Sequence, residues 1–250
     1  KNENQEDKQS KDVQLLLKDL AYGYDKVLLR DINLSIKKGN KTLIVGTSGC
    51  GKSTLFYVLM RLLYPLKGNI FIQGKNYDDL AEKSIREHFA VAFQEHHIFN
   101  LSIRDNFKML YEDITDEEIY KSLENVYLLD FVNQVGLDYI VGNDGNKLSG
   151  GQKHRLQLAI CLAKQKDIIL LDEPTAGLDI KTTNNICSQL MEKYQKQTMI
   201  VTSHDISLLR FFDDIIICGE EKIIEQGNIK KLLLREDSYL NKLIRYKNFI

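Results

Sequence analysis

The chain has 250 residues, of which 43% are hydrophobic, and its formal net charge is −1. That length and composition suit one large domain, or one domain that carries an inserted subdomain. A nearly neutral chain lacks the strong positive field of a general nucleic-acid-binding protein, so we expect no nucleic-acid partner. The most apolar stretch, 55–66, is interrupted by Arg61 and Pro65. We therefore expect no segment that crosses a bilayer by itself.

The N-terminal stretch KNENQEDKQSKD has no apolar residue. It predicts a solvated linker over 1–12, ahead of a folded domain over 13–250. The first residue is Lys rather than Met, and we expect the sequence to be a piece of a longer product. The four cysteines are far apart in the sequence and no pair has C-x-x-C spacing, which favours small side chains in a reducing compartment over a disulfide framework.

Five short apolar runs, each bounded by polar residues or glycine, predict buried strands. The runs are 43–45, 89–93, 168–171, 199–202 and 215–217. Both faces of these runs are apolar, as in parallel strands that helices cover on both sides. Helical patterns over 53–63 and 181–193 follow two of the runs. This alternation favours an α/β sheet.

The middle of the chain has a different pattern. Thr115 and Glu118 have the spacing of a capping box, and Ser149 is an N-cap candidate for a later helix. From about 95 to 165 the patterns are helical, with no convincing strand. We predict a helical subdomain over 95–165, inserted in an α/β core over 13–94 and 166–250.

The stretch GTSGCGKST at 46–54 matches the P-loop pattern, with a predicted strand before it and a predicted helix after it. Its glycines allow backbone N–H groups to converge on phosphate oxygens, and the helix N-terminus adds a positive dipole end. Lys52 is predicted to reach the β- and γ-phosphates, and Ser53 to bind Mg²⁺. The predicted nucleotide-binding residues of the loop are Gly46, Thr47, Ser48, Gly49, Cys50, Gly51, Lys52, Ser53 and Thr54.

Two adjacent carboxylates, Asp172 and Glu173, follow the apolar run 168–171. Ligands of α/β sheets bind at the carboxyl ends of strands, and Mg²⁺ needs only one or two carboxylates. Asp172 is predicted to hold Mg²⁺ through water, and Glu173 to orient the attacking water. The alternative is that both acids merely begin a turn before Pro174.

Two further polar residues follow predicted strands. Gln94 comes after the run 89–93 and is a candidate for ligating Mg²⁺ or positioning water. His204 comes shortly after the run 199–202 and is a candidate hydrogen-bond donor to a γ-phosphate oxygen. Each residue, taken alone, has the alternative of a purely structural role.

The sequence LSGGQ at 148–152 places Ser149, Gly150, Gly151 and Gln152 at the start of a predicted helix. A hydroxyl and free N–H groups at a positive dipole end form a second phosphate grip. The chain could fold this grip over its own P-loop. A simpler arrangement uses two chains, head to tail, each offering LSGGQ to the other's γ-phosphate about a two-fold axis.

These motifs, with IILLDE at 168–173 and AGLD at 176–179, occur in an order that resembles the ATP-binding cassette of ABC transporters, over residues 13–250. The resemblance implies an α/β fold with a P-loop NTPase core of RecA-like type, an N-terminal antiparallel β subdomain and an inserted α-helical subdomain. It implies ATP and Mg²⁺ as cofactors. It also implies ATP hydrolysis, and a dimer with a second nucleotide-binding domain that powers transport at the cytoplasmic face of a membrane.

The same resemblance implies two more roles. Tyr24 would stack on the adenine ring, with Tyr22 as a rival and packing within a sheet as the alternative. Asp179 would lie in the loop that communicates with the opposite site of the dimer. Glu95, His96 and His97 would link Gln94 to a membrane partner rather than bind a metal ion.

The stretch 84–107 resembles exporters, in which transmembrane domains precede this domain in the same chain. VGNDG at 141–145 resembles the exporter loop before LSGGQ, although Asn143 replaces the usual Glu and puts cross-talk through that loop in doubt. DEPTAGLD at 172–179 is similar to importers or to exporters of the cysteine and haem-linked type, and Ile160 replaces a usual Arg. We favour export.

Two other functions compete with transport. One is a soluble cassette ATPase that acts on nucleic acid or in cofactor assembly, although such proteins usually carry long coiled coils or a second cassette. The other is a nucleotide-switched module without hydrolysis, against which the presence of Glu173 and His204 argues. The sequence leaves the cargo open, and also whether the dimer pairs identical or different chains.

Overall fold

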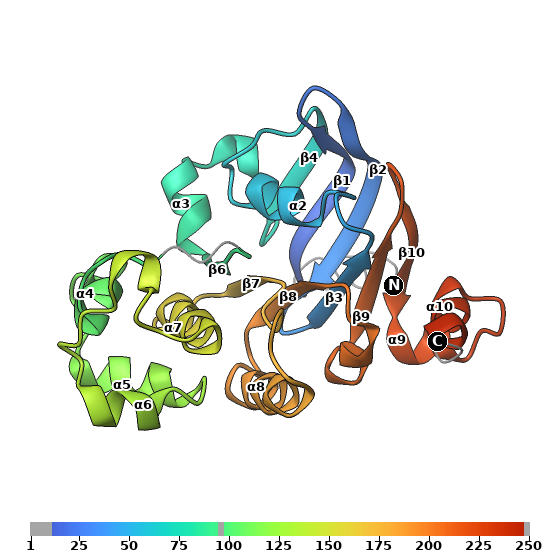
Figure 1. Cartoon of the computed structure of the whole chain (residues 1–250). Helices are drawn as coiled ribbons and strands as arrows, with labels where there is room; N and C mark the ends of the chain where they lie inside the picture. Colours follow the sequence, from blue (N-terminus) through green and yellow to red (C-terminus); the bar gives the residue numbers. More distant parts are fainter. Residues whose placement is uncertain (1–11, 95–97, 248–250) are drawn as a thin grey trace. The chain divides into compact units, whose positions relative to one another are not determined.

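The computed structural model describes residues 12–94 and 98–247 (Figure 1). The linker predicted over 1–12 and the proposed surface of Glu95, His96 and His97 therefore lie wholly or almost wholly outside the described residues. The chain forms two compact units. Unit 1 takes its residues from Lys1–Phe89, Asp167–Leu170 and Lys196–Ile250, and unit 2 consists of Ala90–Lys166 and Leu171–Gln195.

An antiparallel sheet occupies the N-terminal part of unit 1, as the resemblance implies. Its order is β2-β1-β4-β5, with β1 Val13–Gly23, β2 Val27–Lys37, β4 Lys67–Ile72 and β5 Lys75–Asn76. In β2 the buried residues Ile32, Leu34 and Ile36 alternate with exposed ones. That period of two buries one face of the strand and leaves the other in solvent, which is typical of an antiparallel sheet.

The second sheet has the order β10-β9-β3-β8-β7-β6. Its strands are β3 Lys41–Gly46, β6 Phe89–Ala92, β7 Ile168–Asp172, β8 Thr198–Ser203, β9 Asp214–Cys218 and β10 Ile223–Asn228. The five strands predicted from apolar runs are confirmed. β3 pairs in parallel with both β8 and β9, while β10 is antiparallel to β9. The boundary between the units falls inside β7, after Leu170.

The helices of unit 1 are α2 Lys52–Leu59, α3 Glu82–Glu87, α9 Ile229–Leu233 and α10 Tyr239–Lys247, with 3₁₀ turns at Tyr77–Asp79 and Ile206–Phe211. The predicted extension of α2 to residue 63 is wrong. Arg61 has φ 54°, and the N–H of Leu62 donates to the Tyr57 carbonyl at 2.8 Å. These are the features of a Schellman motif, which ends the helix.

Unit 2 contains α4 Ile103–Lys108, α5 Asp116–Glu124, α6 Leu129–Val135, α7 Gly150–Leu162 and α8 Ile180–Lys193, with a 3₁₀ turn at Asn143–Gly145. The predicted capping box of Thr115 and the predicted N-cap of Ser149 are both confirmed. A hydrogen bond from the Ser122 hydroxyl to the Ala159 carbonyl joins α5 to α7. Among the described residues of 95–165 the structure has helices and one isolated bridge, between Ser102 and Ile140.

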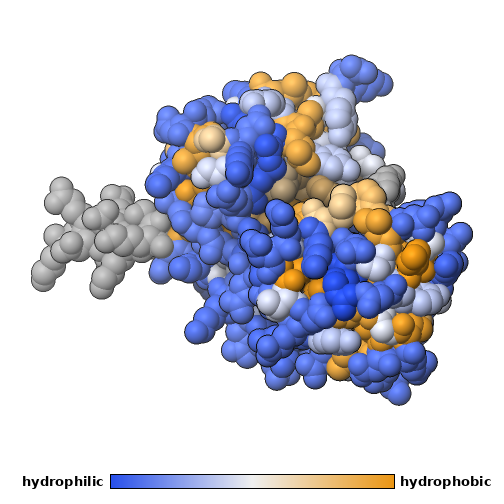
Figure 2. Space-filling view, turned by 90° about the vertical axis from the view of Figure 1, so that its left-hand side faces the viewer, coloured by the Kyte–Doolittle hydropathy of each residue, from blue (hydrophilic) through white to orange (hydrophobic). Residues whose placement is uncertain are grey.

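Among residues 12–94 and 98–247, no helix is long and apolar enough to span a bilayer. Exposed large apolar side chains include Phe99, Met109 and Leu110. On the face that Figure 2 shows, apolar residues form separate patches with hydrophilic residues between them.

Substitution of Tyr22 tests how much the contact between β1 and the P-loop stabilises the fold. Its ring is fully buried, and its hydroxyl donates to the Gly51 carbonyl at 3.0 Å. Tyr22→Phe removes that bond, so we expect a loss of about 1 kcal/mol in the free energy of unfolding, measured in urea. Tyr24→Phe is the control: Tyr24 is 60% exposed, and we expect a change within about 0.5 kcal/mol. Equal losses in the two variants would contradict this role.

Candidate functional site

The backbone of the P-loop depends on glycine at three positions. A Cβ atom on Gly46 would lie 2.7 Å from the Cys218 carbonyl oxygen and 2.8 Å from the Cys50 Sγ. Gly49 has φ 79°, and Gly51, the N-cap of α2, has φ 98°. These conformations suit glycine and are costly for other residues. The loop thus turns directly from β3 into α2, with the exposed residues Thr47 and Ser48 at its outer side.

Lys52 begins α2 inside this loop. Its Nζ donates to the carbonyls of Gly46 and Thr47 at 2.9 and 3.1 Å, which holds the ammonium group against the loop. Ser53 is half-buried and Thr54 is buried. The loop therefore combines one cation, one hydroxyl at a helix N-terminus and backbone donors, which is the donor set that a triphosphate requires.

The two tyrosines near the loop have different surroundings. Tyr22 is fully buried under the loop, so its ring is not available to stack on an external base. Tyr24 lies in the turn between β1 and β2 and is 60% exposed. Its exposed ring is free to stack, so Tyr24 stays the candidate of the pair for the predicted adenine contact.

Unit 1 brings His204 close to the P-loop. The residue follows β8 directly and is exposed. With Gly46, Thr47 and Cys218 it lines a cavity of about 390 Å³, on whose other side Tyr239 and Leu243 of α10 lie. His204 is thus placed at the carboxyl end of the parallel strands, beside the start of the loop.

In unit 2, Asp172 and Glu173 stand where β7 ends. Asp172 is the last residue of β7 and is 4% exposed, whereas Glu173 is half-buried. Glu173 has φ 51°, in the left-handed region that non-glycine residues rarely adopt. Its carbonyl accepts the N–H of Ala176 at 3.1 Å, which closes a turn. Backbone strain of this kind concentrates at functional sites.

Gln94 lies two residues beyond the end of β6, because the strand stops at Ala92 rather than at residue 93, and its side chain is exposed. The segment before it is attached to α7, since Gln157 of that helix donates from Nε2 to the Phe93 carbonyl at 3.2 Å. A displacement of α7 would therefore act directly on the residue next to Gln94.

The LSGGQ segment opens α7. The Ser149 hydroxyl accepts the Gln152 N–H at 3.2 Å, and the Ser149 N–H donates to Gln152 Oε1 at 2.8 Å. Both residues of this capping box are neutral, and the first turn has no acidic residue. A Cβ atom on Gly150 would meet open space, and one on Gly151 would meet only Leu178, at 3.6 Å. Packing against the described residues therefore does not require these two glycines.

Asp179 has a structural role that the sequence reading did not assign. It is the N-cap of α8, where its Oδ1 accepts the Thr182 N–H at 2.9 Å and its Oδ2 accepts the Thr182 hydroxyl at 2.6 Å. These bonds lower the pKa of its carboxyl group. Asp179 is nevertheless exposed at the start of α8, so the same residue can cap the helix and contact a partner chain.

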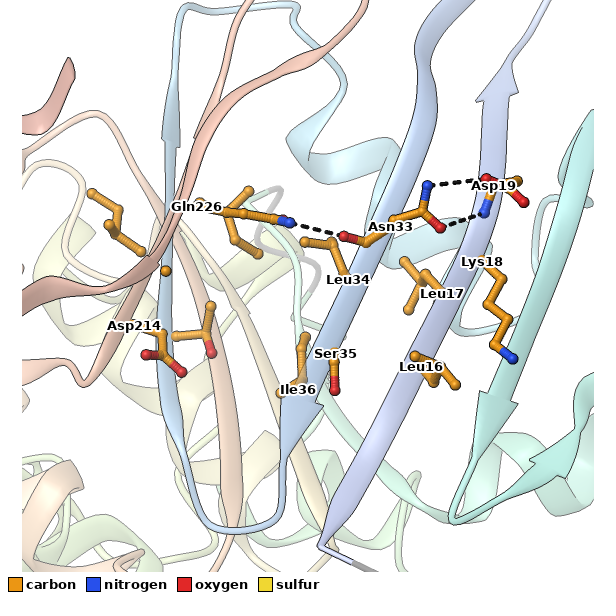
Figure 3. A pocket seen from close by; sticks show the side chains of 14 residues that line it. Leu16, Leu17, Lys18, Asp19, Asn33, Leu34, Ser35, Ile36, Asp214 and Gln226 are labelled. Atoms are coloured by element: carbon orange, nitrogen blue, oxygen red, sulfur yellow. Dashed lines mark hydrogen bonds between the residues drawn. The ribbon is translucent and has the colours of Figure 1, made fainter. Parts of the chain in front are cut away.

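A different and larger cavity, of about 570 Å³, lies between β1 and β2 on one side and β9 and β10 on the other (Figure 3). Asn33 exchanges hydrogen bonds with Asp19 at 3.0 Å, and Gln226 donates to the Asn33 carbonyl at 2.9 Å. None of the predicted site residues lines this cavity.

The family model described as ABC transporter matches residues 29–176. The chain belongs to the ABC transporter family.

Its relatives include proteins named for transport. A β-(1→2)glucan export ATP-binding/permease protein of Agrobacterium vitis is 34% identical over 82% of the chain and 35% of the relative. A glutathione/L-cysteine transport system ATP-binding/permease protein of Escherichia coli is 34% identical over 91% of the chain and 40% of the relative. The chain thus spans well under half the length of these curated relatives.

A solved structure agrees with this family. A bacterial Atm1-family ABC exporter with ATP bound has a TM-score of 0.88 and is 29% identical, covering 94% of this chain and 42% of that one. The fold predicted from the sequence is therefore confirmed, and the ABC chain carries the ATP-binding domain of the family.

The donor chemistry of the ABC chain fits Mg²⁺. Among the described residues there is no group of three or more His, Cys, Asp and Glu side chains that could hold a metal ion alone. Mg²⁺ is usually held by one or two protein oxygens together with phosphates and waters. The hydroxyl of Ser53, the carboxylate of Asp172 and the amide oxygen of Gln94 are hard oxygen donors of the required kind.

The sequence reading missed a neighbour of the P-loop, Cys218, the last residue of β9. The thiol of Cys218 hydrogen bonds to Cys50, and this bond, aided by Lys52, lowers the pKa of the Cys50 thiol to about 6 although burial opposes it. The same bond, together with burial, raises the pKa of Cys218. No sequence signal could have paired these cysteines, since only the register of two distant strands places them together.

Alkylation offers a test of this environment. We expect the rate of Cys50 labelling by iodoacetamide to rise through about pH 6 and to level off by about pH 8, because the thiolate is the nucleophile. Cys161 is the control: burial raises the pKa of its thiol, so little thiolate is present and we expect it to stay unlabelled. A Cys50 rate that still climbs at pH 9 would contradict the lowered pKa.

Bound Mg-ATP should slow the same reaction, because phosphates over the loop would cover Cys50. Equal labelling with and without nucleotide, measured by mass spectrometry of the Cys50 peptide, would place this residue away from the phosphates.

Proposed function

We propose that the chain binds and hydrolyses ATP with Mg²⁺, and that ATP-dependent pairing with a second nucleotide-binding domain powers export of a substrate at the cytoplasmic face of a membrane. In this proposal, transmembrane domains precede it in the full-length protein. The family, the export and transport functions named in its relatives, and their ATP-binding/permease organisation support this reading over a soluble cassette ATPase. The cargo stays open because the membrane domains would select it.

Unit 1 supplies the nucleotide-binding groups of the proposal. The backbone N–H groups of residues 46–54 hold the phosphates, while Lys52 reaches the β- and γ-phosphates and Ser53 binds Mg²⁺. Tyr24 stacks on the adenine ring, which its exposure allows. His204 donates a hydrogen bond to the γ-phosphate, a role supported by its place beside Gly46 and Thr47.

Unit 2 supplies the groups for hydrolysis. Asp172, through water, and Gln94 would hold Mg²⁺, which when bound would neutralise charge that develops on the phosphates. Glu173 orients the attacking water and polarises it. Its φ of 51° supports this role, since strained backbone conformations cluster at functional sites.

The observation that carries the dimer proposal is the open surface at Gly150. Glycine in a helix costs stability relative to alanine, and no described residue lies within 4 Å of the place that a Cβ atom on Gly150 would take. A phosphate bound to a second chain is a group that would occupy the space beside Gly150. Ser149, Gly150, Gly151 and Gln152 therefore complete the partner's site, with Asp179 close to the same surface of the partner.

Glu173→Gln tests hydrolysis and pairing together. We expect turnover to fall by about 10²–10³-fold, because a preorganised catalytic contact is lost, while ATP binding is kept. Light scattering should then show a dimer with Mg-ATP and a monomer with Mg-ADP. A monomer in both nucleotides at high protein concentration would contradict the shared site.

Gly150→Ala distinguishes an effect on packing within the monomer from an effect on contact with the partner chain. The added methyl group meets open space, so the melting temperature of the monomer should not fall. In the Glu173→Gln background the methyl should nevertheless weaken the ATP dimer by about tenfold or more, because it lies where the partner's phosphate would approach. The control is Glu117→Ala, in the exposed first turn of α5, which should leave the dimer intact. Equal dimerisation in both variants would remove Gly150 from the interface.

A further inference from the structure

Two of the four cysteines come together beneath the P-loop. Gly46 is the register partner of Cys218 between the parallel strands β3 and β9. The loop then folds back over the end of β3, so that Cys50 Sγ lies 2.8 Å from the point where a Gly46 Cβ would stand, and Cys218 Cβ lies 3.0 Å from the same point. The missing side chain of Gly46 thus leaves the space in which the two thiols meet, and they are hydrogen bonded to each other.

The surroundings of the pair favour the thiolate form of Cys50, which is the nucleophile, while Cys218 stays a thiol beside it. Lys52 Nζ lies 4.0 Å from Cys50 Sγ, and its positive charge favours the thiolate. The pKa of Cys50 is lowered to about 6, while that of Cys218 is raised. A low-pKa thiol next to a second cysteine is the arrangement found in redox-sensing sites.

A small reagent has a route to this pair. Cys50 is 8% exposed and Cys218 4% exposed, so neither is sealed completely from solvent. Cys218 lines the cavity of about 390 Å³ that also contacts Thr47, His204 and Glu220. Hydrogen peroxide is small enough to enter such a space, whereas a protein thiol is not.

We propose that Cys50 and Cys218 form a reversible intrachain disulfide with hydrogen peroxide as the oxidant, and that this bond lowers the affinity of the P-loop for ATP. The Cys50 thiolate attacks one peroxide oxygen; an S–O bond forms, the O–O bond breaks, and hydroxide leaves and is protonated to water. The Cys218 sulfur then attacks the Cys50 sulfenic acid; the S–S bond forms, the S–O bond breaks, and the Cys218 proton leaves with hydroxide as a second water. Two thiols are oxidised and one peroxide is reduced.

The effect on nucleotide follows from the position of Cys50 in the loop. A disulfide replaces a hydrogen-bonded contact with a covalent bond of about 2.0 Å, which draws the middle of the loop toward β9. The N–H groups on either side of Cys50, and Lys52 two residues later, shift with it. Displacements of about 1 Å at a preorganised site cost up to about 10²-fold, so we expect binding to weaken by about tenfold or more. This consequence rests on the proposed ATP site, whereas formation of the bond does not.

The first experiment treats the reduced chain with one equivalent of peroxide at neutral pH. Mass spectrometry should show the loss of two hydrogen atoms, and a non-reduced digest should contain the Cys50 and Cys218 peptides joined. Cys218→Ser should instead gain oxygen at Cys50, while the matched control Cys187→Ser, at a buried cysteine of α8, should still form the bond. Oxygen addition at Cys50 without a cross-link in the unsubstituted chain, or a cross-link to another cysteine, would overturn the proposal.

The second measurement is binding of trinitrophenyl-ATP to the reduced, oxidised and dithiothreitol-treated chain. We expect weak binding only in the oxidised form, with recovery on reduction. A mapped disulfide with unchanged binding would overturn the switch. A reduced chain that fails to bind the nucleotide would instead contradict the proposed function, and the mapping result would stand independently of it.

Discussion

The P-loop depends on the absence of a side chain at Gly46. β3 ends there between β8 and β9, and the chain must turn at once so that α2 can begin at Lys52. Any Cβ at this position would strike the Cys218 carbonyl and the Cys50 sulfur. A larger residue would push the loop away from β9 and separate Lys52 from the carbonyls of Gly46 and Thr47, on which the position of its ammonium group depends.

Backbone strain is used differently in the two units. Arg61 of unit 1 adopts φ 54° to end α2, and its guanidinium stacks on the Tyr64 ring at 4.3 Å and pairs with Asp78, which offsets the cost of that conformation. Glu173 of unit 2 adopts φ 51° directly after a buried strand, at the residue proposed to act on water. At Arg61 the left-handed conformation ends α2 at a position where glycine is the usual residue.

Three of the helix N-termini in the described residues, those of α8, α7 and α2, are capped in three different ways. α8 is capped by the carboxylate of Asp179, whose own negative charge meets the positive end of the helix. α7 is capped by the neutral pair Ser149 and Gln152, and α2 by Gly51 with no side-chain bond. Neither α2 nor α7 has an acidic residue at its cap or in its first turn, as the proposed phosphate contacts require.

The sequence by itself determined the parallel strands, the P-loop, the acids after β7 and the LSGGQ helix start. It could do so because each is a local pattern: apolar runs, glycine spacing and capping residues act over a few neighbouring positions. The antiparallel strand β2 follows local alternation too, whereas the hydrogen bond from Tyr22 of β1 to the P-loop joins residues far apart in the sequence.

Tertiary structure decided the contacts between residues far apart in the chain. The end of α2 depended on whether Arg61 would accept a left-handed conformation, and the choice between Tyr22 and Tyr24 depended on burial. Cys50 and Cys218 meet because β3 and β9 pair in a register that sets Gly46 beside Cys218. Strand register arises from the packing of the whole sheet, so no stretch of sequence around either cysteine carries that information.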